Sequence, residues 1–494
     1  MIKKYVYKVS FYILSAIILS GCNDFLDEKP KSDFTQEGTG SEDLTSKYLS
    51  ISDAQTELQG AYNTYKLNNF QMEIFMLNDV QSDNCYVGGD GTNEEAVDLL
   101  TMTSTNSHAS LVWSEWLTMI GTATNVIENT KLMKASAATD IEKNAVIAEA
   151  KFIRAWACFD LVRIFGGIPL VLQLIPTITS ENLDTWYPVM YPKRTSEEKV
   201  YEQILVDLDE TNTISYLPSK NTGAFQATKG AAYGLLAKVL ATRGDKNSRN
   251  YTKVIDYCNK VINEGYKLVD NFDDLWNPDH KFTTESIFEV YYSADSPNWA
   301  YWVFLKEGDG SVTWRRYCTP THDLVAKFDK EKDTRYASSI LWRSVPYSAY
   351  WPADKYPLSY KIREKNSDII LMRLADIMLL KAEALVETGE TGKAIDIVNT
   401  IRQRAGLGNS SLNKNMAQSE ARIAVENERQ LELYMEGQRW FDLTRNDRTI
   451  DVMRKHKDQK GNLIFKKIQG FRIKWPIPQG EMDKNTNLVQ NEGY

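Results

Sequence analysis

The sequence predicts a mainly α-helical protein in which tetratricopeptide-like helical hairpins form a scaffold, interrupted by a loop-rich insertion with a few short β-strands. Three observations carry this prediction. Apolar residues recur at helical spacing through most of residues 53–264 and 368–445, two hairpins look like copies of each other, and the helical period is lost in between, over 265–367. With 494 residues, 43% of them apolar, the chain has ample material for a buried core.

The first 22 residues form a secretory signal. They hold three lysines, an apolar run from Val9 to Leu19, and small residues that end in Cys22. A run of this length is too short to span a membrane, so residues 1–21 are expected to be a signal peptide. Leu19-Ser20-Gly21-Cys22 has the pattern of a bacterial lipobox, which predicts lipidation of Cys22; the alternative is an ordinary signal peptide with an incidental cysteine. Residues 22–50 then form a polar leader ahead of a single domain, 51–494.

The helices are expected in a regular order along the scaffold. Apolar residues at 3–4 spacing predict a helix over 148–165 that stops at Gly166-Gly167-Ile168-Pro169, since glycine and proline end helices. Within the insertion, Ser286–Tyr292 reads as a short strand. Further helices are predicted over 197–210, 227–243, 251–264, 368–388, 392–404 and 417–436.

Two of the predicted hairpins share a sequence pattern. Segment 237–245 matches 382–390 in its Ala, Leu and Gly positions, and 253–259 matches 393–399 as Lys-x-Ile-Asp-x-x-Asn. The first copy has five extra residues in its turn. Small residues at fixed positions let two helices pack closely, and a glycine ends the first helix of each pair. This pattern is typical of tetratricopeptide-like repeat proteins. The alternative is coincidence between two amphipathic hairpins.

Composition and charge argue against several functional classes. The 66 acidic residues outnumber the 58 basic ones, the net charge is -8, and no basic run stands out, so a nucleic-acid partner is not expected. The four histidines are scattered and none pairs on one helix face, which argues against a histidine-ligated metal and a histidine-based hydrolytic triad. No cofactor is expected, and the four remaining cysteines form no CxxC pair.

The tryptophans fall into two predicted populations. Trp113, Trp116, Trp156 and Trp440 lie in apolar helical runs and are expected in the core. Six aromatic residues of the insertion instead sit among Ser, Asp, Pro, Asn and Gly, where one helix face cannot bury them together. Loops held on a rigid frame are common places for binding residues. These six residues are Trp299, Tyr301, Trp302, Trp314, Trp342 and Trp351.

Seven collinear blocks, from the lipobox to the last residue, resemble the SusD/RagB family of nutrient-binding lipoproteins of Bacteroidota. They include AEAKFIRAWACFDLVRIFGGIPLV (148–171), MRLADIMLLKAEAL (372–385) and ERQLELYMEGQRWFDLTR (428–445). The resemblance implies a lipid-anchored protein at the cell surface that lies over a SusC-like, TonB-dependent outer-membrane transporter. It also implies capture of a nutrient, usually an oligosaccharide and in some members a peptide, and its delivery to the transporter without chemical change. Residues 271–365 match no family pattern, so the resemblance does not name the ligand.

The candidate ligand-binding residues come from two segments. Flat aromatic rings stack on the apolar face of a sugar, which favours Trp299, Tyr301, Trp302, Trp314 and Trp342; the alternative is that these rings form the small core of an irregular subdomain. Asp83 and Asn84 lie in a polar turn, 78–86, at a place where the resemblance implies a loop of the binding face. A helix-capping turn is an equally good interpretation of that pair.

Two other motifs have a structural and a functional interpretation. Glu428, Glu432 and Glu436 share one helix face at i, i+4, i+8, but carboxylates on a single helix do not flank a substrate, and arginines at 429, 439 and 445 are near to neutralise them. The loop Gly88–Glu95 has oxygen ligands that calcium prefers but lacks the spacing of a calcium loop, which favours a surface loop at the rim of the binding face.

The function expected from the sequence is therefore capture of a glycan and its delivery to the transporter, without catalysis. Three alternatives stay open: a peptide-binding member of the same family, a surface glycoside hydrolase, and a protein-interaction scaffold.

Overall fold

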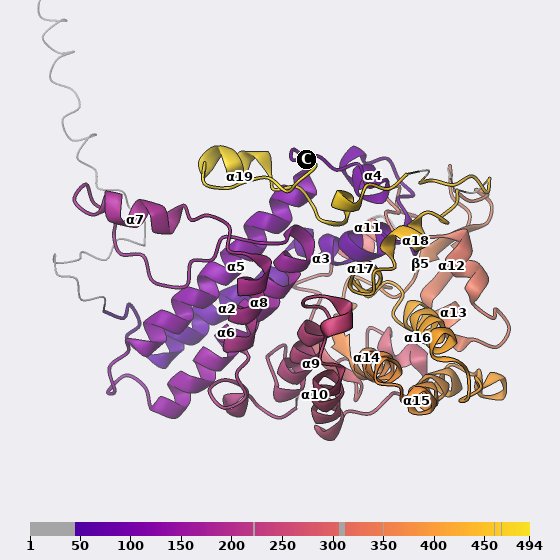
Figure 1. The fold of residues 1–494 in the computed structure, drawn as a ribbon, viewed down its shortest axis with the longest axis horizontal. Coiled ribbons are helices and arrows are strands. Elements are labelled where there is room, and N and C mark those ends of the chain that lie inside the picture. The colour runs from indigo at the N-terminus through magenta and orange to yellow at the C-terminus, as the bar shows by residue number, and fades with distance from the viewer. Residues whose placement is uncertain (1–44, 221–222, 306–311, 349, 459, 466) are drawn as a thin grey trace, which may run out of the picture.

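The computed structural model describes residues 45–494, apart from 221–222, 306–311, 349, 459 and 466. The predicted signal peptide, the lipidation site Cys22 and the leader up to residue 44 lie outside the described residues. Figure 1 shows an elongated molecule in which long helices at one end lead into a row of hairpins and then into a region of loops and short strands.

The first part of the scaffold is built on a pair of long helices, α5 (Ser107–Lys131) and α6 (Asp140–Phe165), which pack along each other with α2 (Ile51–Asn63) and α8 (Glu197–Asp207). Helix α6 begins at a capping box between Thr139 and Glu142 and ends at Gly166, whose φ of 78° suits glycine. Trp113 and Trp116 of α5 and Trp156 of α6 are buried, as predicted, and so is Trp440.

The two predicted copies are confirmed as hairpins. Helices α9 (Lys229–Leu240) and α10 (Tyr251–Asn263) form the first, and α14 (Leu374–Glu387) and α15 (Thr391–Arg404) form the second. Gly244 and Gly389 follow the first helix of each hairpin with positive φ, 68° and 82°. The extra residues of the first copy hold a short 3-10 turn, Lys246–Ser248. Helix α10 packs against α14, and α16 (Gln418–Glu432) packs against α14 and α15, so the hairpins stack in one row.

One predicted helix is wrong at its start. Residues 368–373 were expected in the helix 368–388, but Ile369–Arg373 form strand β6, which pairs antiparallel with β2 (Ser286–Val290). All five β6 residues are buried, and Gly234 of α9 lies so close that an added Cβ would come within 2.3 Å of Met372 Sδ. A short, fully buried apolar run has no polar face, so periodicity alone does not distinguish a strand from a helix.

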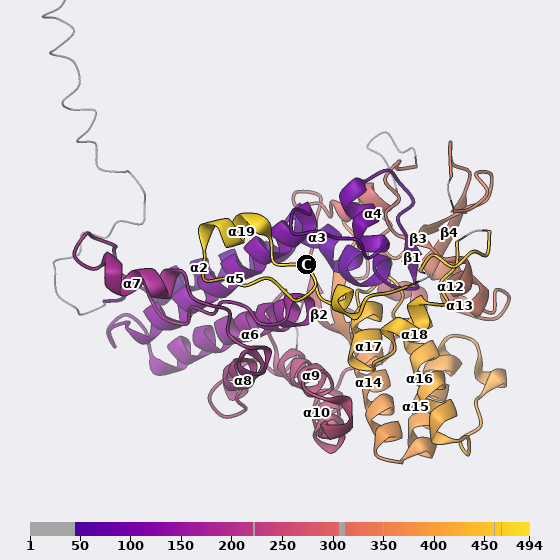
Figure 2. The same cartoon turned by 45° about the horizontal axis from the view of Figure 1, so that its top comes forward.

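The insertion forms short elements on the side of the hairpin row, as Figure 2 shows. Strand β3 (Thr319–Pro320) pairs with β1 (Cys85–Tyr86), and β4 (Ile340–Arg343) pairs with β5 (Tyr356–Ser359). The helices of the insertion are α11 (Ala300–Phe304), α12 (His322–Lys327) and α13 (Thr334–Ser339). One hydrophobic core runs from Tyr48 to Leu488 and includes insertion residues such as Phe304, so the insertion packs on the scaffold's own core.

The remaining helices are short. They are α3 (Asn68–Phe75), α4 (Thr92–Asp98), α7 (Leu183–Met190), α17 (Arg439–Arg445), α18 (Thr449–Met453) and α19 (Gln479–Lys484). Helix α7 is unusual because it contains no buried residue although most of its side chains are apolar. In the part of the chain that the structure describes, no helix is both long and apolar enough to cross a bilayer.

Candidate functional site

Four side chains of the insertion form a partly exposed surface that we call the aromatic face: Trp299, Trp314, Arg315 and Tyr347. Trp314 is 42% exposed and Tyr347 is 47% exposed, while Trp299 is half-buried. The Arg315 guanidinium lies 4.7 Å from the Trp314 ring centroid and 5.7 Å from that of Trp299. Tyr347 Oη donates to the Trp314 carbonyl oxygen at 3.1 Å. Two indoles are thus held beside one cation at the surface.

The scaffold holds this face in place through buried polar contacts. The side-chain oxygen of Gln71, fully buried on α3, accepts hydrogen bonds from the backbone N–H groups of Trp299 and Ala300. On the other side, the Gly88 N–H donates to the Arg316 carbonyl oxygen at 3.0 Å. The next residue, Gly89, is so close to the insertion that a Cβ atom would lie 2.0 Å from the Arg315 carbonyl oxygen. Only glycine fits there, and this close approach fixes the backbone of Arg315.

The other predicted aromatic residues lie in two places. Tyr301 and Trp302 follow Trp299 on α11 and are half-buried, with ring centroids 5.7 Å apart. Trp342 lies on β4, where its indole N–H donates to Tyr336 Oη at 2.8 Å and its ring meets Trp351 edge-on at 5.2 Å. The structure therefore brings Trp299 and Trp314 together around Arg315, whereas Trp342 pairs with Trp351 in the packing of the insertion.

Asp83 and Asn84 lie in the interior and not on an exposed face, which corrects the expectation that they reach a ligand. Asp83 is 8% exposed and takes two hydrogen bonds from Arg439, at 2.7 and 2.8 Å. Burial alone raises the pKa of Asp83, but Arg439 outweighs it and lowers that pKa to about 2. Asn84, fully buried, donates to Asp79 and accepts from Gln430. These contacts fix the turn 78–86 against α16 and α17.

The three glutamates of the α16 region are paired with basic residues that lie far away in sequence. Glu428 meets Arg335 at 2.6 Å, Glu432 meets Arg373 at 2.6 Å, and Glu436 meets Arg373 at 2.7 Å. Burial disfavours the charged form of Glu432, but Arg404, Arg373 and Arg335 together hold its pKa below the usual value. The arginines expected as partners from their proximity in sequence bind other acids: Arg429 pairs with Asp376 and Asp442, Arg439 with Asp83, and Arg445 with Glu383.

This pairing bears on the glycosidase alternative. Glycoside hydrolysis needs one protonated and one ionised carboxyl group on opposite sides of a substrate. Glu428, Glu432 and Glu436 are at most 8% exposed and hold ion pairs. Burial raises the pKa of two other carboxyl groups, Glu289 and Asp368, and the charge of Asp368 raises that of Glu289 further, to about 8. Glu289 is, however, only 2% exposed. Sequence spacing offered no signal for this pair.

The segment Gly88–Glu95 was predicted as a surface loop, but helix α4 begins within it at Thr92, and Glu94 of that helix forms an ion pair with the scaffold. His108, near the start of α5, lies 2.6 Å from Glu73 through Nδ1 and 3.4 Å from Glu94 through Nε2. Burial lowers the pKa of His108, but Glu73 outweighs it and raises that pKa to about 10, so the ring is a cation at neutral pH. Glu94 is thereby tied to α5. No group of three or more His, Cys, Asp or Glu suited to a metal ion occurs among the described residues.

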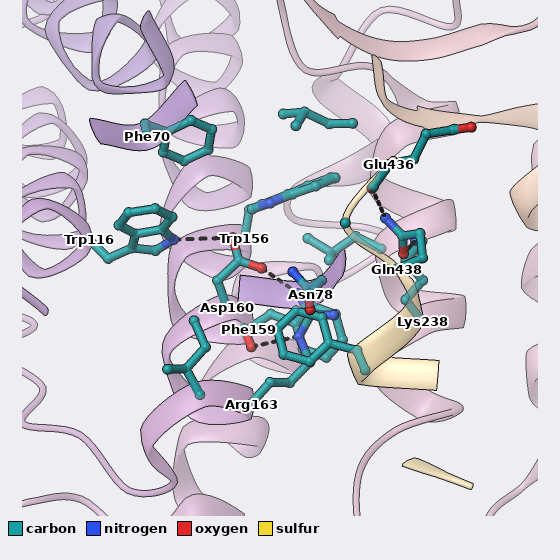
Figure 3. Close-up of a pocket in the computed structure, with 15 residues that line it drawn as sticks. Phe70, Asn78, Trp116, Trp156, Phe159, Asp160, Arg163, Lys238, Glu436 and Gln438 are labelled. Atoms are coloured by element: carbon teal, nitrogen blue, oxygen red, sulfur yellow. Dashed lines mark hydrogen bonds and ion pairs between the residues drawn. The ribbon is translucent and has the colours of Figure 1, made fainter. Parts of the chain in front are cut away.

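An internal pocket lies between α6 and the segment after α16 (Figure 3), and it is too small for a sugar. Its volume is about 50 Å³, while ligand sites are typically about 300–1,000 Å³. Its polar groups face one another: Trp116 Nε1 donates to Asp160 at 3.1 Å, and Asp160 pairs with Arg163. This space has room for a few water molecules only.

A larger groove of about 490 Å³ lies between α5, residues 169–175 and the C-terminal segment. Trp113, Leu117 and Ile120 form one wall, and Tyr191 and Leu488 contribute to the other. The groove lies among the long helices and α19, whereas the aromatic face belongs to the insertion. This groove is the alternative to the aromatic face as a ligand-binding site.

Two family profiles and several relatives of similar length match the chain. The SusD family profile matches residues 344–494, and a profile described as starch-binding and associating with the outer membrane matches residues 24–240. SusD-like protein P2 of Formosa agariphila is 26% identical over 99% of both chains, and the starch-binding protein SusD of Bacteroides thetaiotaomicron is 23% identical over 86% of both.

Solved structures show the same fold. The surface glycan-binding protein A of Bacteroides fluxus superposes with a TM-score of 0.73 at 21% identity, over 90% of this chain and 99% of that one. The matching profiles and the full-length relatives show that this chain belongs to the SusD/RagB family.

Proposed function

We propose that this protein is a lipid-anchored, cell-surface binding protein that captures a glycan on its aromatic face and passes it, unchanged, to a TonB-dependent transporter of the outer membrane. The observation that carries the proposal is the partly exposed pair Trp299 and Trp314 around Arg315. Indole rings offer flat apolar surfaces to the C–H face of a sugar, and the guanidinium offers donors to its hydroxyl groups. Relatives named for starch binding and for surface glycan binding support the glycan as ligand.

Binding without catalysis is supported by the state of the buried acids. Glu428, Glu432 and Glu436 are neutralised by arginine and lysine. Glu289 is a buried residue of β2, and Asp368 directly precedes β6. Neither set borders the aromatic face through any contact among the described residues. A glycan held on that face therefore meets rings and a cation, which bind it but do not cleave it.

Calorimetric titration against a panel of soluble polysaccharides and oligosaccharides tests the proposal. Trp299→Ala and Trp314→Ala are expected to weaken binding of the recognised glycan about tenfold or more, because a stacked aromatic ring contributes on the order of 1–2 kcal/mol. Tyr187→Ala is the control, since Tyr187 is 46% exposed on α7, away from the insertion. Absence of binding to every glycan in the panel, together with binding to a protein digest, would favour peptide capture instead.

The partner is proposed to dock on the segment around α7. Leu183 and Tyr187 are 42% and 46% exposed, and Ile175, in the segment before the helix, is 39% exposed. Clustered apolar and aromatic side chains of this kind mark protein contact surfaces. Both views place α7 and the start of α2 at the same end of the molecule, which is the end nearest the predicted lipid anchor along the chain.

Co-purification with the TonB-dependent transporter from an outer-membrane extract tests this surface. The variant Leu183→Ser with Tyr187→Ser is expected to lose the transporter while keeping its glycan affinity. If the variant keeps the transporter, the partner binds elsewhere.

A further inference from the structure

Two consecutive arginines of the insertion, Arg315 and Arg316, have no carboxylate partner among the described residues. Arg316 differs in this respect from the other buried arginines. Six other described arginines are also buried, at 0–6% exposed, and every one of them holds an ion pair with an acid. Those six are Arg154, Arg335, Arg373, Arg429, Arg439 and Arg445. Arg316, at 1% exposed, is the exception within this set.

The Arg316 side chain lies directly under the aromatic face. Its Nη1 donates to the Tyr347 carbonyl oxygen at 2.9 Å, and its guanidinium lies 4.5 Å from the Tyr347 ring centroid and 4.9 Å from that of Tyr356. Its Nε and Nη2 atoms are buried and have no hydrogen-bond partner. A buried charge without a countercharge is destabilising, because no ion pair offsets the free energy lost when the charge leaves water. Within the described part of the chain, the positive charge of Arg316 is therefore balanced by no carboxylate.

Arg315 adds a second cation at the surface above it. Its guanidinium contacts the rings of Trp299 and Trp314, and no acid within 4.0 Å is described for it. Among the described acids, Glu94 is influenced by Arg315, but its ion-pair partner is the His108 cation, 3.4 Å away. A guanidinium that contacts aromatic rings still has free N–H groups along its edge, and these form a fork that fits planar, bidentate anions.

We propose that the glycan captured on the aromatic face is anionic. A carboxylate of a uronic acid or a sulfate ester accepts hydrogen bonds from Arg315 while its sugar ring lies against Trp299 and Trp314, and Arg316 beneath them strengthens the positive potential. This inference rests on the proposed function and names the class of its ligand. The protein as a whole has a net charge of -8, so the attraction for an anionic glycan is local to the two arginines. This attraction weakens as the salt concentration rises, because salt screens an exposed ion pair.

Matched pairs of glycans test the inference: polygalacturonate against its methyl ester, and dextran sulfate against dextran. Affinities are measured by calorimetry for the wild type, Arg315→Ala, and the control Arg343→Ala, which removes an exposed arginine of the same insertion. A charge-assisted hydrogen bond contributes about tenfold to hundredfold in affinity. We expect the charged member of at least one pair to bind about ten to a hundred times more tightly than its neutral partner. A preference within the polygalacturonate pair identifies a carboxylate as the recognised group, and a preference within the dextran pair identifies a sulfate.

The Arg315→Ala variant is expected to remove that preference, because it weakens binding of the charged member far more than binding of the neutral member, while Arg343→Ala changes neither. Raising the salt concentration is expected to weaken binding of the charged glycan alone. Several results would overturn the inference: equal affinity for both members of every bound pair, an equal loss for both members in Arg315→Ala, or binding of poly-glutamate with no glycan bound. Binding of neutral glycans alone leaves the proposed function standing, whereas binding of no glycan at all removes both.

Discussion

Arg335 ties the insertion to the scaffold through buried ion pairs with Glu428 and Glu432, and its removal is a direct test of the buried ion network. It lies on α13, is fully buried, and donates to Asp333, Glu428 and Glu432 at 2.6–3.0 Å. The variant Arg335→Met keeps much of the volume but removes the charge. Glu432 retains Arg373 and Arg404, and Glu428 retains Arg402, but Asp333 loses its ion-pair partner.

The expected loss follows from the cost of an uncompensated buried charge. Breaking a buried ion pair by removing one partner costs about 3–5 kcal/mol. For a chain of this size the unfolding entropy is about 0.9 kcal/mol per kelvin, so the melting temperature should fall by about 3–5 °C. The second variant Asp333→Asn, introduced into Arg335→Met, is expected to recover part of the loss, because it removes the charge that was left without a partner.

Differential scanning calorimetry on purified protein provides the assay, with Arg422→Met as the matched control. Arg422 forms a bidentate ion pair with Glu387, with hydrogen bonds of 2.8 and 2.9 Å, but its side chain is 40% exposed. A surface pair contributes about 0–1 kcal/mol, so the control should lower the melting temperature by about 1 °C or less. Equal shifts in the buried and the surface variant would refute the reasoning, and so would a double variant less stable than Arg335→Met.

Other outcomes follow from the same structure. Burial and Asp368 raise the pKa of Glu289 from 4.5 to about 8. The stability linked to its protonation is therefore complete below pH 4.5 and is lost as pH rises through 8. The melting temperature of wild type relative to Glu289→Gln should fall between pH 5 and pH 9 in fluorimetric scans; a constant difference would contradict this. Gly89→Ala places a Cβ against the Arg315 backbone and should lower both stability and glycan affinity. Gly60→Ala, in open space on α2, should leave glycan affinity unchanged and not lower the melting temperature; equal losses would contradict the close contact at Gly89.

The repeat scaffold could be predicted because its signals are local. The period of the apolar residues, the glycines at 244 and 389, and the small residues at 237 and 382 all act within one hairpin. The core positions of Trp113 and Trp440 follow from the same pattern. Strand β6 was missed because a short run buried on both faces has no period to read.

The partners of the charged residues could not be predicted, because they depend on contacts between distant parts of the chain. Glu428 and Arg335 lie 93 positions apart, and Asp83 and Arg439 lie 356 positions apart. Proximity in sequence pointed to the wrong arginines for the glutamates and offered no partner for Asp83. For the aromatic face, the sequence identified the tryptophans. The arginine pair at 315–316, flanked by Trp314 and Tyr317, was the local signal left unused.

The most direct test of the account is a crystal structure of the protein with a glycan that it binds in solution. The account predicts a sugar ring against Trp299 and Trp314, with an anionic substituent at Arg315. Density for the glycan in the groove of about 490 Å³ between α5 and the C-terminal segment, with the aromatic face empty, would contradict it.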